Sequence, residues 1–533
     1  MSHPARIARA VMVLGTTSGA GKSWLATALC RWYARQGLKV APFKAQNMSN
    51  NARVVPGLPG PDGRTRLGEI GSAQYFQALA ARTVPEVRHN PVLLKPEADT
   101  RSQVVVLGEV RRDLADLPWR SRSERLWPHA RDALSALQAD HDVVVIEGAG
   151  SPAEINLHAS DYVNMRTARA ADAACVLVTD IDRGGAFAHL YGTHALLPAE
   201  ERALIRGFVL NRFRGDPALL SPGPEQLQAL TGVPTLGVLP MWHGHGLPEE
   251  DGLHDGPAEA GAAAGGVTHR IAIIVPPRIS NLDEFQPLRQ LPGVRLIWAR
   301  QPADIDGVDW VVLPGSKHSR ADLAWLRAQR LDAAIARHAA AGGAVLGICG
   351  GLQMLGEALI DLDGVEGPTA APGGAHDATV SATMDTTIEA NMPGLGLLPL
   401  VTRFEPDKLL RPGRSRFARL DPTGPWAALS GIAWQGYEIH HGRSVPHPAM
   451  PAPQVALQDA AGAPIGWQAG PRGNVLGLYA HGLFESPDVL QALFGARVRT
   501  LDAVFDGLAD FIDTHLGSAA LLRLLKTTGD TPS

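Results

Sequence analysis

The sequence predicts an α/β protein built from two doubly wound domains, and three observations lead to this fold class. An apolar run, a glycine-rich turn and a helical pattern follow one another over Val11–Ser23, read as VMVLGTTSGAGKS. This is the order of a phosphate-binding loop in a parallel-sheet domain. Apolar strand patterns alternate with helical patterns in both halves of the chain, as expected for open parallel sheets. A second strand-turn-helix signal, GAVLGICGGLQMLG, surrounds Cys349.

The chain divides into four predicted parts. Residues 1–250 form the first α/β domain, and residues 251–268, which are rich in Ala and Gly and lack periodicity, form a linker. Residues 269–505 form the second domain. Residues 506–533 have the apolar spacing of a helical tail, which we expect to pack on the second domain.

Composition excludes several classes of function. The 533 residues carry a net charge of -4, so the chain offers no basic field for a nucleic acid. No apolar run approaches the ~20 residues that span a bilayer, and the N-terminus lacks an apolar signal core. The 3 cysteines do not suggest a disulfide framework. We expect a cytoplasmic protein without membrane or nucleic-acid partners, and the sequence is compatible with a homo-oligomer.

The phosphate loop predicts an ATP site. Gly19 and Gly21 let backbone N–H groups converge on a phosphate, and the following helix adds its positive N-terminal dipole. Lys22 is expected to neutralise the outer phosphates and Ser23 to hold Mg²⁺. These residues are therefore the predicted ATP-binding core.

Other strands of the first domain end in polar residues. Glu147 directly follows the apolar strand VVVI, and a carboxylate at this place is expected to be the second Mg²⁺ ligand. Asn211 ends the strand GFVL, and its amide can read both edge groups of adenine. Ligands bind outside the carboxyl ends of parallel strands. We therefore expect substrate contacts from the polar residues near this edge, which are Lys44, Gln46, Asn47, Gln74, Asp180, Asp182 and Arg183.

The segment around Cys349 has the G-x-C-x-G form of a nucleophile elbow. A sharp turn at a helix N-terminus exposes the sulfur and favours the reactive thiolate. The N–H of Gly350, together with one from Gly315 or Ser316 in the turn LPGSK, can form an oxyanion hole. A thiol nucleophile needs a base, and His481 stands at the end of the apolar strand NVLGLYA.

His440 and His441, in GYEIHHGRS, form a competing site for this base. Two centres in one chain suggest a division of labour, in which the thiol releases ammonia from glutamine and the ATP site activates a carboxylate to receive it.

At this point the chain resembles the cobyric acid synthase family of glutamine-dependent amidotransferases over essentially its whole length. The segments that carry the likeness are KAQNMS, VIEGAGSPAEINL and TDIDRGGAFA. The N-terminal half is similar to dethiobiotin synthetase, whose phosphate loop has the longer glycine spacing seen here from Gly15 to Gly21. The second half resembles the class I glutamine amidotransferase domain of the cobalamin type. In the wider class a glutamate follows the base by two residues, where Leu483 stands here, and Glu485 is the candidate for orienting His481.

The resemblance implies a function and its partners. It implies ATP- and Mg²⁺-dependent amidation of the b, d, e and g carboxylates of adenosylcobyrinic acid a,c-diamide, a corrinoid, with glutamine as nitrogen donor. It also implies that Cys349 and His481 act as a catalytic pair. Two alternatives stay open, which are cobyrinic acid a,c-diamide synthase and a partition-like ATPase switch without a product.

Overall fold

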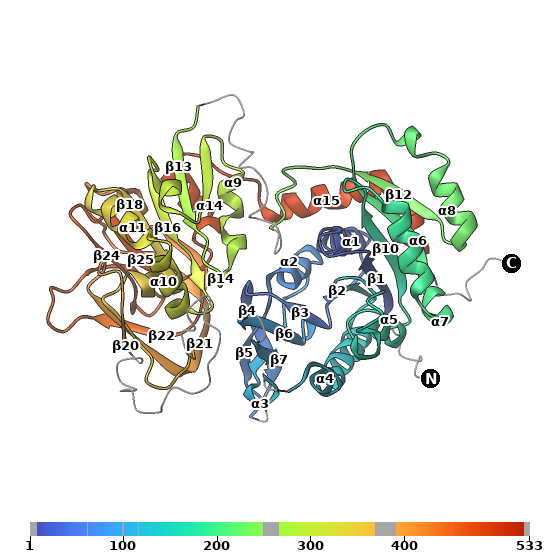
Figure 1. The fold of residues 1–533 in the computed structure, drawn as a ribbon, viewed down its shortest axis with the longest axis horizontal. Coiled ribbons are helices and arrows are strands. Elements are labelled where there is room, and N and C mark those ends of the chain that lie inside the picture. Colours follow the sequence, from blue (N-terminus) through green and yellow to red (C-terminus); the bar gives the residue numbers. More distant parts are fainter. Residues whose placement is uncertain are drawn as a thin grey trace. The chain divides into compact units, whose positions relative to one another are not determined.

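The structure, a computed structural model, describes residues 8–60, 62–98, 101–115, 117–248, 266–367 and 391–526. Contacts divide the chain into two compact units, both drawn in Figure 1. Unit 1 comprises Met1–Ser49, Val55–Asp251 and Arg499–Ser533. Unit 2 comprises Asn50–Val54 and Gly252–Val498. Both units are α/β, and the predicted fold class is confirmed.

Unit 1 is organised around a parallel sheet of six strands in the order β12-β11-β10-β1-β9-β2. Alternate side chains of β1 point to opposite faces, so Val13 packs into one apolar cluster and Met12 into another. Both faces are covered by helices, as a parallel sheet requires. The strands are β1 Arg9–Gly15, β2 Val40–Phe43, β9 Val143–Glu147, β10 Ala174–Asp180, β11 Ile205–Phe213 and β12 Thr235–Pro240.

The helices of unit 1 form two layers. The first layer packs with β1 through Val13 and consists of α1 Lys22–Arg35, α2 Ser72–Ala80, α15 Leu501–Leu516 and α16 Ser518–Arg523. The second layer covers the opposite face and includes α4 Trp119–Asp140, α5 Met165–Ala170, α6 Ala186–Leu196 and α8 Gly223–Thr231. Figure 1 shows α1 and α15 along the same side of the sheet.

A smaller sheet lies in the segment after β2. Its order is β3-β6-β7-β8, and β3 pairs in parallel with β6. The strands are β3 Gln46–Met48, β6 Val92–Ala98, β7 Arg101–Val106 and β8 Glu109–Val110. A separate hairpin joins β4 Ala52–Pro59 to β5 Thr65–Gly71. The smaller sheet fixes the polar segment that begins at Lys44.

Unit 2 contains a sheet of eleven strands that is parallel at one end and mostly antiparallel at the other. The parallel part has the order β15-β13-β16-β18-β25, with bounds Val294–Ala299, His269–Ile274, Trp310–Leu313, Ala344–Ile348 and Val475–Leu478. The antiparallel part contains β24 Pro464–Ala469, β23 Gln454–Gln458, β21 Leu400–Phe417 and β22 Ala433–Pro446. Two short strands, β14 Ile279–Ser280 and β17 Gly315–Ser316, pair separately.

The expected packing of the C-terminal tail is wrong. Helices α15 and α16 pack on α1 of unit 1, and not on the second domain. Arg31 forms an ion pair with Asp502, and the Trp32 indole donates to Asp513 at 3.0 Å. An apolar stripe shows that a helix buries one face, but it does not show which core receives that face. Residues 251–265 of the predicted linker lie outside the described residues.

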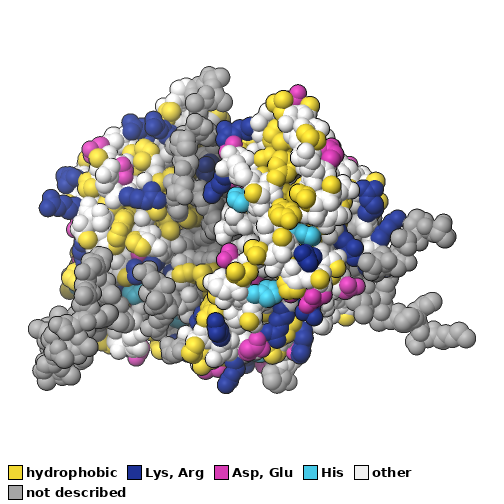
Figure 2. All heavy atoms as spheres, turned by 45° about the vertical axis from the view of Figure 1, so that its right-hand side comes forward, with side chains coloured by type: hydrophobic (Ala, Val, Ile, Leu, Met, Phe, Trp, Pro, Cys, Tyr) yellow, Lys and Arg dark blue, Asp and Glu magenta, His cyan; other side chains and the backbone are white. Residues whose placement is uncertain are grey.

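Charges of both signs are spread over the face of the molecule drawn in Figure 2. On the face drawn in Figure 2, Lys and Arg side chains are interspersed with Asp, Glu and apolar side chains, and no broad basic patch is visible. Of the helices in the described ranges, none combines the length and the apolar character needed to cross a bilayer.

Candidate active sites

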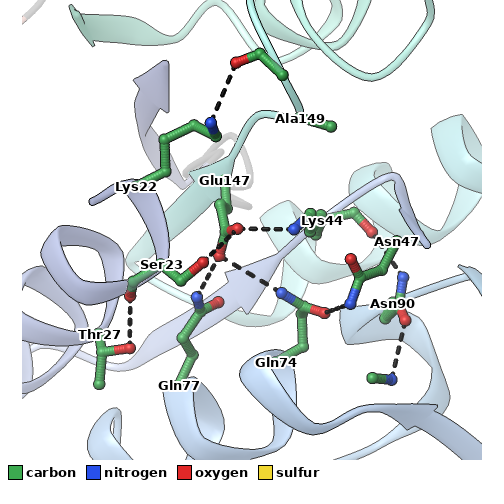
Figure 3. Close-up of polar contacts among 12 residues, drawn as sticks. Lys22, Ser23, Thr27, Lys44, Asn47, Gln74, Gln77, Asn90, Glu147 and Ala149 are labelled. Atoms are coloured by element: carbon green, nitrogen blue, oxygen red, sulfur yellow. Dashed lines mark hydrogen bonds and ion pairs between the residues drawn. The ribbon is translucent and has the colours of Figure 1, made fainter. Parts of the chain in front are cut away.

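The phosphate loop joins β1 to α1 and is shaped by glycine. Gly19 and Gly21 have φ angles of 72° and 98°, which residues with a Cβ atom seldom adopt. The Lys22 ammonium turns back over the loop and donates to the carbonyls of Thr17 at 2.9 Å and Gly150 at 3.1 Å. Its second contact is drawn in Figure 3. A cation and a helix N-terminus therefore meet where the nucleotide phosphates are expected.

Asn211 of β11 contacts the phosphate loop directly. Its amide donates to the Ala20 carbonyl at 3.0 Å, and its Oδ1 accepts from the Arg212 amide at 2.9 Å. A Cβ atom on Gly21 would clash with the Asn211 amide nitrogen, so glycine is required there for space as well as for its φ angle. The role of Asn211 in reading adenine stays a prediction.

Glu147, at the end of β9, is the centre of the polar group drawn in Figure 3. Its Oε1 accepts from Ser23 Oγ at 2.8 Å and from Lys44 Nζ at 2.7 Å. Its Oε2 accepts from Gln77 at 2.5 Å and from Gln74 at 3.5 Å. Gln77 was not predicted, although it follows Gln74 at the i,i+3 spacing that puts two side chains on one helix face.

The ionisation of Glu147 follows from these contacts. Burial opposes its charge, but the Lys44 ammonium and the hydrogen bonds from Lys44, Gln77 and Ser23 hold its pKa below the ordinary value. A carboxylate and a hydroxyl 2.8 Å apart are the hard oxygen donors that Mg²⁺ prefers. Within the part of the chain that the structure describes, no cluster of three His, Cys, Asp or Glu residues could hold a metal by itself. The pair therefore fits Mg²⁺ shared with nucleotide phosphates.

The loop after β2 joins this polar group. The Asn47 amide donates to Gln74 Oε1 at 3.2 Å, and Gln74 in turn reaches Glu147. Gln46 accepts from the Tyr162 hydroxyl at 2.8 Å. Lys44, Asn47 and Gln74 are thus brought together around one carboxylate, as Figure 3 shows. Their contact with a substrate stays a prediction.

The predicted acidic residues at the end of β10 and just after it, Asp180 and Asp182, have arginine partners. Asp180 is buried and accepts from Arg212 at 3.0 Å, and it lies 3.6 Å from Arg183. Asp182 accepts from Arg214 through both carboxylate oxygens, at 2.7 and 2.6 Å. The Arg183 side chain is 75% exposed. These contacts give Asp180 and Asp182 a structural role, and their role toward substrate also stays a prediction.

A cavity of about 260 Å³ opens beside the phosphate loop. Its polar wall is formed by the loop and by the group around Glu147, and its apolar wall includes Trp24, Phe76 and Leu247. A cavity that joins a phosphate cradle to apolar side chains suits a nucleotide, whose base is planar and largely apolar.

Cys349 stands on a strained turn between β18 and α12, Gly350–Leu355. Its φ and ψ angles are 51° and -105°, which are unusual for a residue with a side chain. A Cβ atom on Gly350 would lie 2.7 Å from the Ser316 nitrogen, and one on Gly351 would clash with the Leu313 carbonyl. The two glycines therefore allow the sharp turn, as in a nucleophile elbow. The Cys349 side chain is largely buried, with the residue 5% exposed.

His481 follows β25 and is held by a carboxylate from a distant segment. Its Nδ1 lies 3.1 Å from Glu284 Oε1, and Glu284 Oε2 accepts from the Gly482 amide at 3.0 Å. Burial alone would lower the pKa of His481, but the charges of Glu284 and Cys349 and hydrogen bonds to both raise it to about 10. His481 is therefore coupled to Cys349 on one side and to Glu284 on the other.

The carboxylate that contacts the His481 ring belongs to Glu284 and not to Glu485, the residue expected from the sequence. Glu485 does not orient His481, because its carboxylate accepts from the Arg53 guanidinium at 2.6 and 3.1 Å. Glu284 lies in a single 3-10 turn, Leu282–Phe285, and is separated from His481 by 197 residues. The sequence signal that could have drawn attention to Glu284 is the motif LDEF, in which an acidic pair stands between two apolar residues.

The competing histidines have other partners. His440 uses both ring nitrogens, with Nδ1 2.7 Å from the Gly442 carbonyl and Nε2 3.2 Å from Glu438. Burial is the largest influence on the pKa of His440 and lowers it. His441 contacts a main-chain carbonyl of β21 at 3.0 Å. The geometry therefore favours His481 as the base for Cys349.

The predicted oxyanion hole is compact. A Cβ atom on Gly315 would lie 2.8 Å from His481 Cε1, and one on Gly350 would lie against the Ser316 nitrogen. The β17 strand, the Cys349 turn and His481 therefore converge. The Ser316 hydroxyl donates to buried Asp322 at 2.6 Å and so fixes the turn that would carry one of the oxyanion-hole amides. The use of these amides stays a prediction.

Comparisons with known proteins cover both units. Residues 11–244 match the model of the CobQ/CobB/MinD/ParA nucleotide binding domain, and residues 270–489 match that of the CobB/CobQ-like glutamine amidotransferase domain. The chain is 75% identical over 520 residues to a protein of Leptothrix cholodnii named cobyric acid synthase, with 97% of both chains covered. It is 72% identical over 521 residues to a protein of Methylibium petroleiphilum with the same name, again with 97% of both chains covered.

Proposed function

This chain belongs to the cobyric acid synthase family, and we propose that it amidates the b, d, e and g carboxylates of adenosylcobyrinic acid a,c-diamide. The products would be adenosylcobyric acid, glutamate, ADP and phosphate. Each amidation would consume one ATP and one glutamine. The reaction takes place in the cytoplasm in this proposal, and the protein needs neither a membrane nor a nucleic acid.

The observation that carries the proposal is the presence of two complementary centres in one chain. Unit 1 contains a phosphate loop beside a buried carboxylate, and unit 2 contains a cysteine on a strained turn beside a paired histidine. The relatives favour this function over cobyrinic acid a,c-diamide synthase and over a partition-like switch.

The ATP centre would activate the corrinoid carboxylate. Bound Mg²⁺ would be held by Ser23 and Glu147 and would offset the charge of the nucleotide phosphates. Lys22 would stabilise the transferring phosphoryl group and Lys44 would orient the substrate carboxylate, a proposal supported by the position of Lys22 over the phosphate loop and of Lys44 beside Glu147. The carboxylate oxygen attacks the γ-phosphorus, ADP leaves, and an acyl phosphate forms. Ammonia then attacks the acyl carbon, and phosphate leaves.

The thiol centre would supply that ammonia. The Cys349 thiolate attacks the side-chain amide carbon of glutamine, and His481 gives a proton to the departing nitrogen, so that ammonia and a thioester form. His481 then takes a proton from water, which attacks the thioester and releases glutamate. Glu284 holds the imidazole in place and stabilises its charged form. The Gly350 and Ser316 amides would bind the oxygen of each tetrahedral intermediate, which the close approach of Gly350 to the Ser316 nitrogen supports.

A C349A variant tests the proposal. We expect it to lose amidation with glutamine and to keep amidation with a high concentration of ammonium, because only the source of nitrogen is removed. Product masses would show replacement of each carboxyl hydroxyl by an amino group. Loss of both activities in a folded C349A protein would contradict the separation of the two centres. Feeding cobyrinic acid and its a,c-diamide separately distinguishes the proposed substrate from that of the a,c-diamide synthase.

A further inference from the structure

Five residues from the N-terminal part of the chain belong to unit 2. Residues 1–49 and 55–251 have most of their contacts in unit 1, whereas Asn50–Val54 have theirs in unit 2. This short segment follows β3, at the end of the stretch that contains Lys44 and Asn47. The glutaminase unit is therefore completed by residues that are covalently continuous with the ATP centre.

Two asparagines attach the segment to the turn that contains Glu284. The Leu282 amide donates to Asn51 Oδ1 at 3.0 Å, and the Ala52 amide donates to Asn281 Oδ1 at 3.0 Å. Asn281 has a φ angle of 56°, and both asparagines are buried. Buried reciprocal hydrogen bonds of this kind fix one backbone segment against another.

Arg53 is the charged residue of the segment, and it is 2% exposed. Its guanidinium forms an ion pair with Asp283 and donates to both oxygens of Glu485, at 2.6 and 3.1 Å. It also lies over the Tyr437 ring, 4.9 Å from the ring centre. A planar guanidinium with fixed donors can hold several groups in one arrangement.

Each partner of Arg53 either contacts His481 itself or lies within three residues of a residue that contacts His481 or the amide that follows it. Asp283 precedes Glu284, the carboxylate that contacts the His481 ring. Tyr437 stacks on that ring with centroids 5.4 Å apart, and its carbonyl accepts from the His481 amide at 2.8 Å. Glu485 ends the short turn Leu483–Glu485, which begins just after the amide that Glu284 binds.

From these contacts we propose that Arg53 is a positioning residue for the catalytic base His481, and that segment 50–54 supplies it to the glutaminase centre. The inference deepens the proposed function and rests on it. Arg53 contacts three segments around His481, so its removal should loosen the Glu284–His481 contact. In this proposal Arg53 itself does not contact glutamine. The rate of hydrolysis should therefore fall more than the affinity for glutamine.

The test compares R53M and R53K with a control, R327M, in the full chain. Arg327 is also in unit 2, and it donates to the carbonyls of Pro393 and Gly394 at 2.6 and 2.8 Å. Glutamate release from glutamine gives kcat and KM, and amidation with ammonium reports on the ATP centre. For R53M we expect kcat to fall by on the order of 100-fold with little change in KM and in ammonium-dependent amidation. R53K should recover part of the loss, and R327M should match the wild type.

A second readout reports on the Cys349–His481 pair directly. Cys30 and Cys175 are completely buried, whereas Cys349 keeps 5% exposure, so alkylation of the folded protein by iodoacetamide should report on Cys349. A displaced imidazole would stabilise the thiolate less, so alkylation at neutral pH should be slower in R53M and in R53K than in the wild type. This comparison keeps the proposal testable through R53K if R53M does not fold.

Several results would overturn the proposal. Hydrolysis by R53M within about twofold of the wild-type rate would do so, as would unchanged alkylation in both Arg53 variants. Loss of glutaminase and ammonium-dependent activity together in folded R53M would show a general structural role instead. A wild type that hydrolyses glutamine but amidates no corrinoid would count against the proposed function alone, because the Arg53 comparison uses glutamine hydrolysis.

Discussion

Replacing Glu284 by glutamine should separate the charge of this residue from its shape. Glu284 contacts the His481 ring at 3.1 Å and the following amide at 3.0 Å. The pKa of His481 is about 10, against an ordinary value of 6.5. Because one pKa unit corresponds to ~1.4 kcal/mol, the folded environment as a whole, with burial opposing and charges and hydrogen bonds favouring, stabilises the imidazolium by about 5 kcal/mol. If Glu284 supplies about 2 kcal/mol of this, E284Q should hydrolyse glutamine on the order of 30-fold more slowly.

The pH dependence of E284Q gives a second measure of the same effect. A raised pKa keeps His481 protonated at neutral pH, and this charged form is lost as the pH rises toward 10. Without the Glu284 charge, the pKa of His481 should fall, and the alkaline limb of glutamine hydrolysis should move to lower pH. The assay is glutamate release across pH, with E405Q as a control because Glu405 is half exposed and pairs with Arg443. Wild-type rate and an unmoved alkaline limb in E284Q would refute the role given to Glu284.

Three further predictions concern other parts of the chain. E147Q should bind ATP with Mg²⁺ at least about tenfold more weakly, since a charged oxygen ligand is lost; calorimetry measures this, and equal affinity would count against Glu147 as a ligand. Burial raises the pKa of Asp322 from 3.8 to about 7. The contribution of this carboxyl group to the free energy of unfolding is therefore fully present below about pH 4 and is lost as the pH rises through 7. The free energy of unfolding, measured across pH, should fall by up to about 4 kcal/mol in the wild type and should lack this fall in D322N. The same pH profile in both proteins would contradict the raised pKa of Asp322. R31M removes the buried Arg31 guanidinium and its ion pair with Asp502, whose side chain is 73% exposed, and should destabilise unit 1 by about 1 kcal/mol, which denaturant unfolding and proteolysis of the C-terminal helices would detect; unchanged stability would show that α15 docks without it.

Local patterns predicted the parts of the fold that local chemistry determines. The strand, glycine turn and helix of the phosphate loop occur as expected, and so does the strained turn at Cys349. Both depend on residues close together in sequence, because glycine relieves a clash or permits a φ angle at a fixed offset from Lys22 or Cys349. The alternation of strands and helices likewise predicted the parallel sheets.

The missed and incorrect parts depend on contacts between distant residues. Glu284 was missed because it approaches His481 from 197 residues away and belongs to no recurring spacing. The partners of Arg53 are likewise distant, since Glu485 lies 432 residues further along the chain. The predicted packing of α15 was wrong because its amphipathic pattern shows that one face is buried but not which core receives that face. The selection of a partner is a property of packed surfaces, which the sequence of one element does not encode.

Isotope transfer tests the central claim most directly, which is that the thiol centre frees nitrogen for a carboxylate activated at the ATP centre. Glutamine labelled with ¹⁵N in its amide would be supplied with ATP and a corrinoid labelled with ¹⁸O in its carboxylates. We predict ¹⁵N in each new amide, even when unlabelled ammonium is present at low concentration, and one ¹⁸O in each phosphate released. Phosphate free of ¹⁸O, or product without ¹⁵N, would contradict the account.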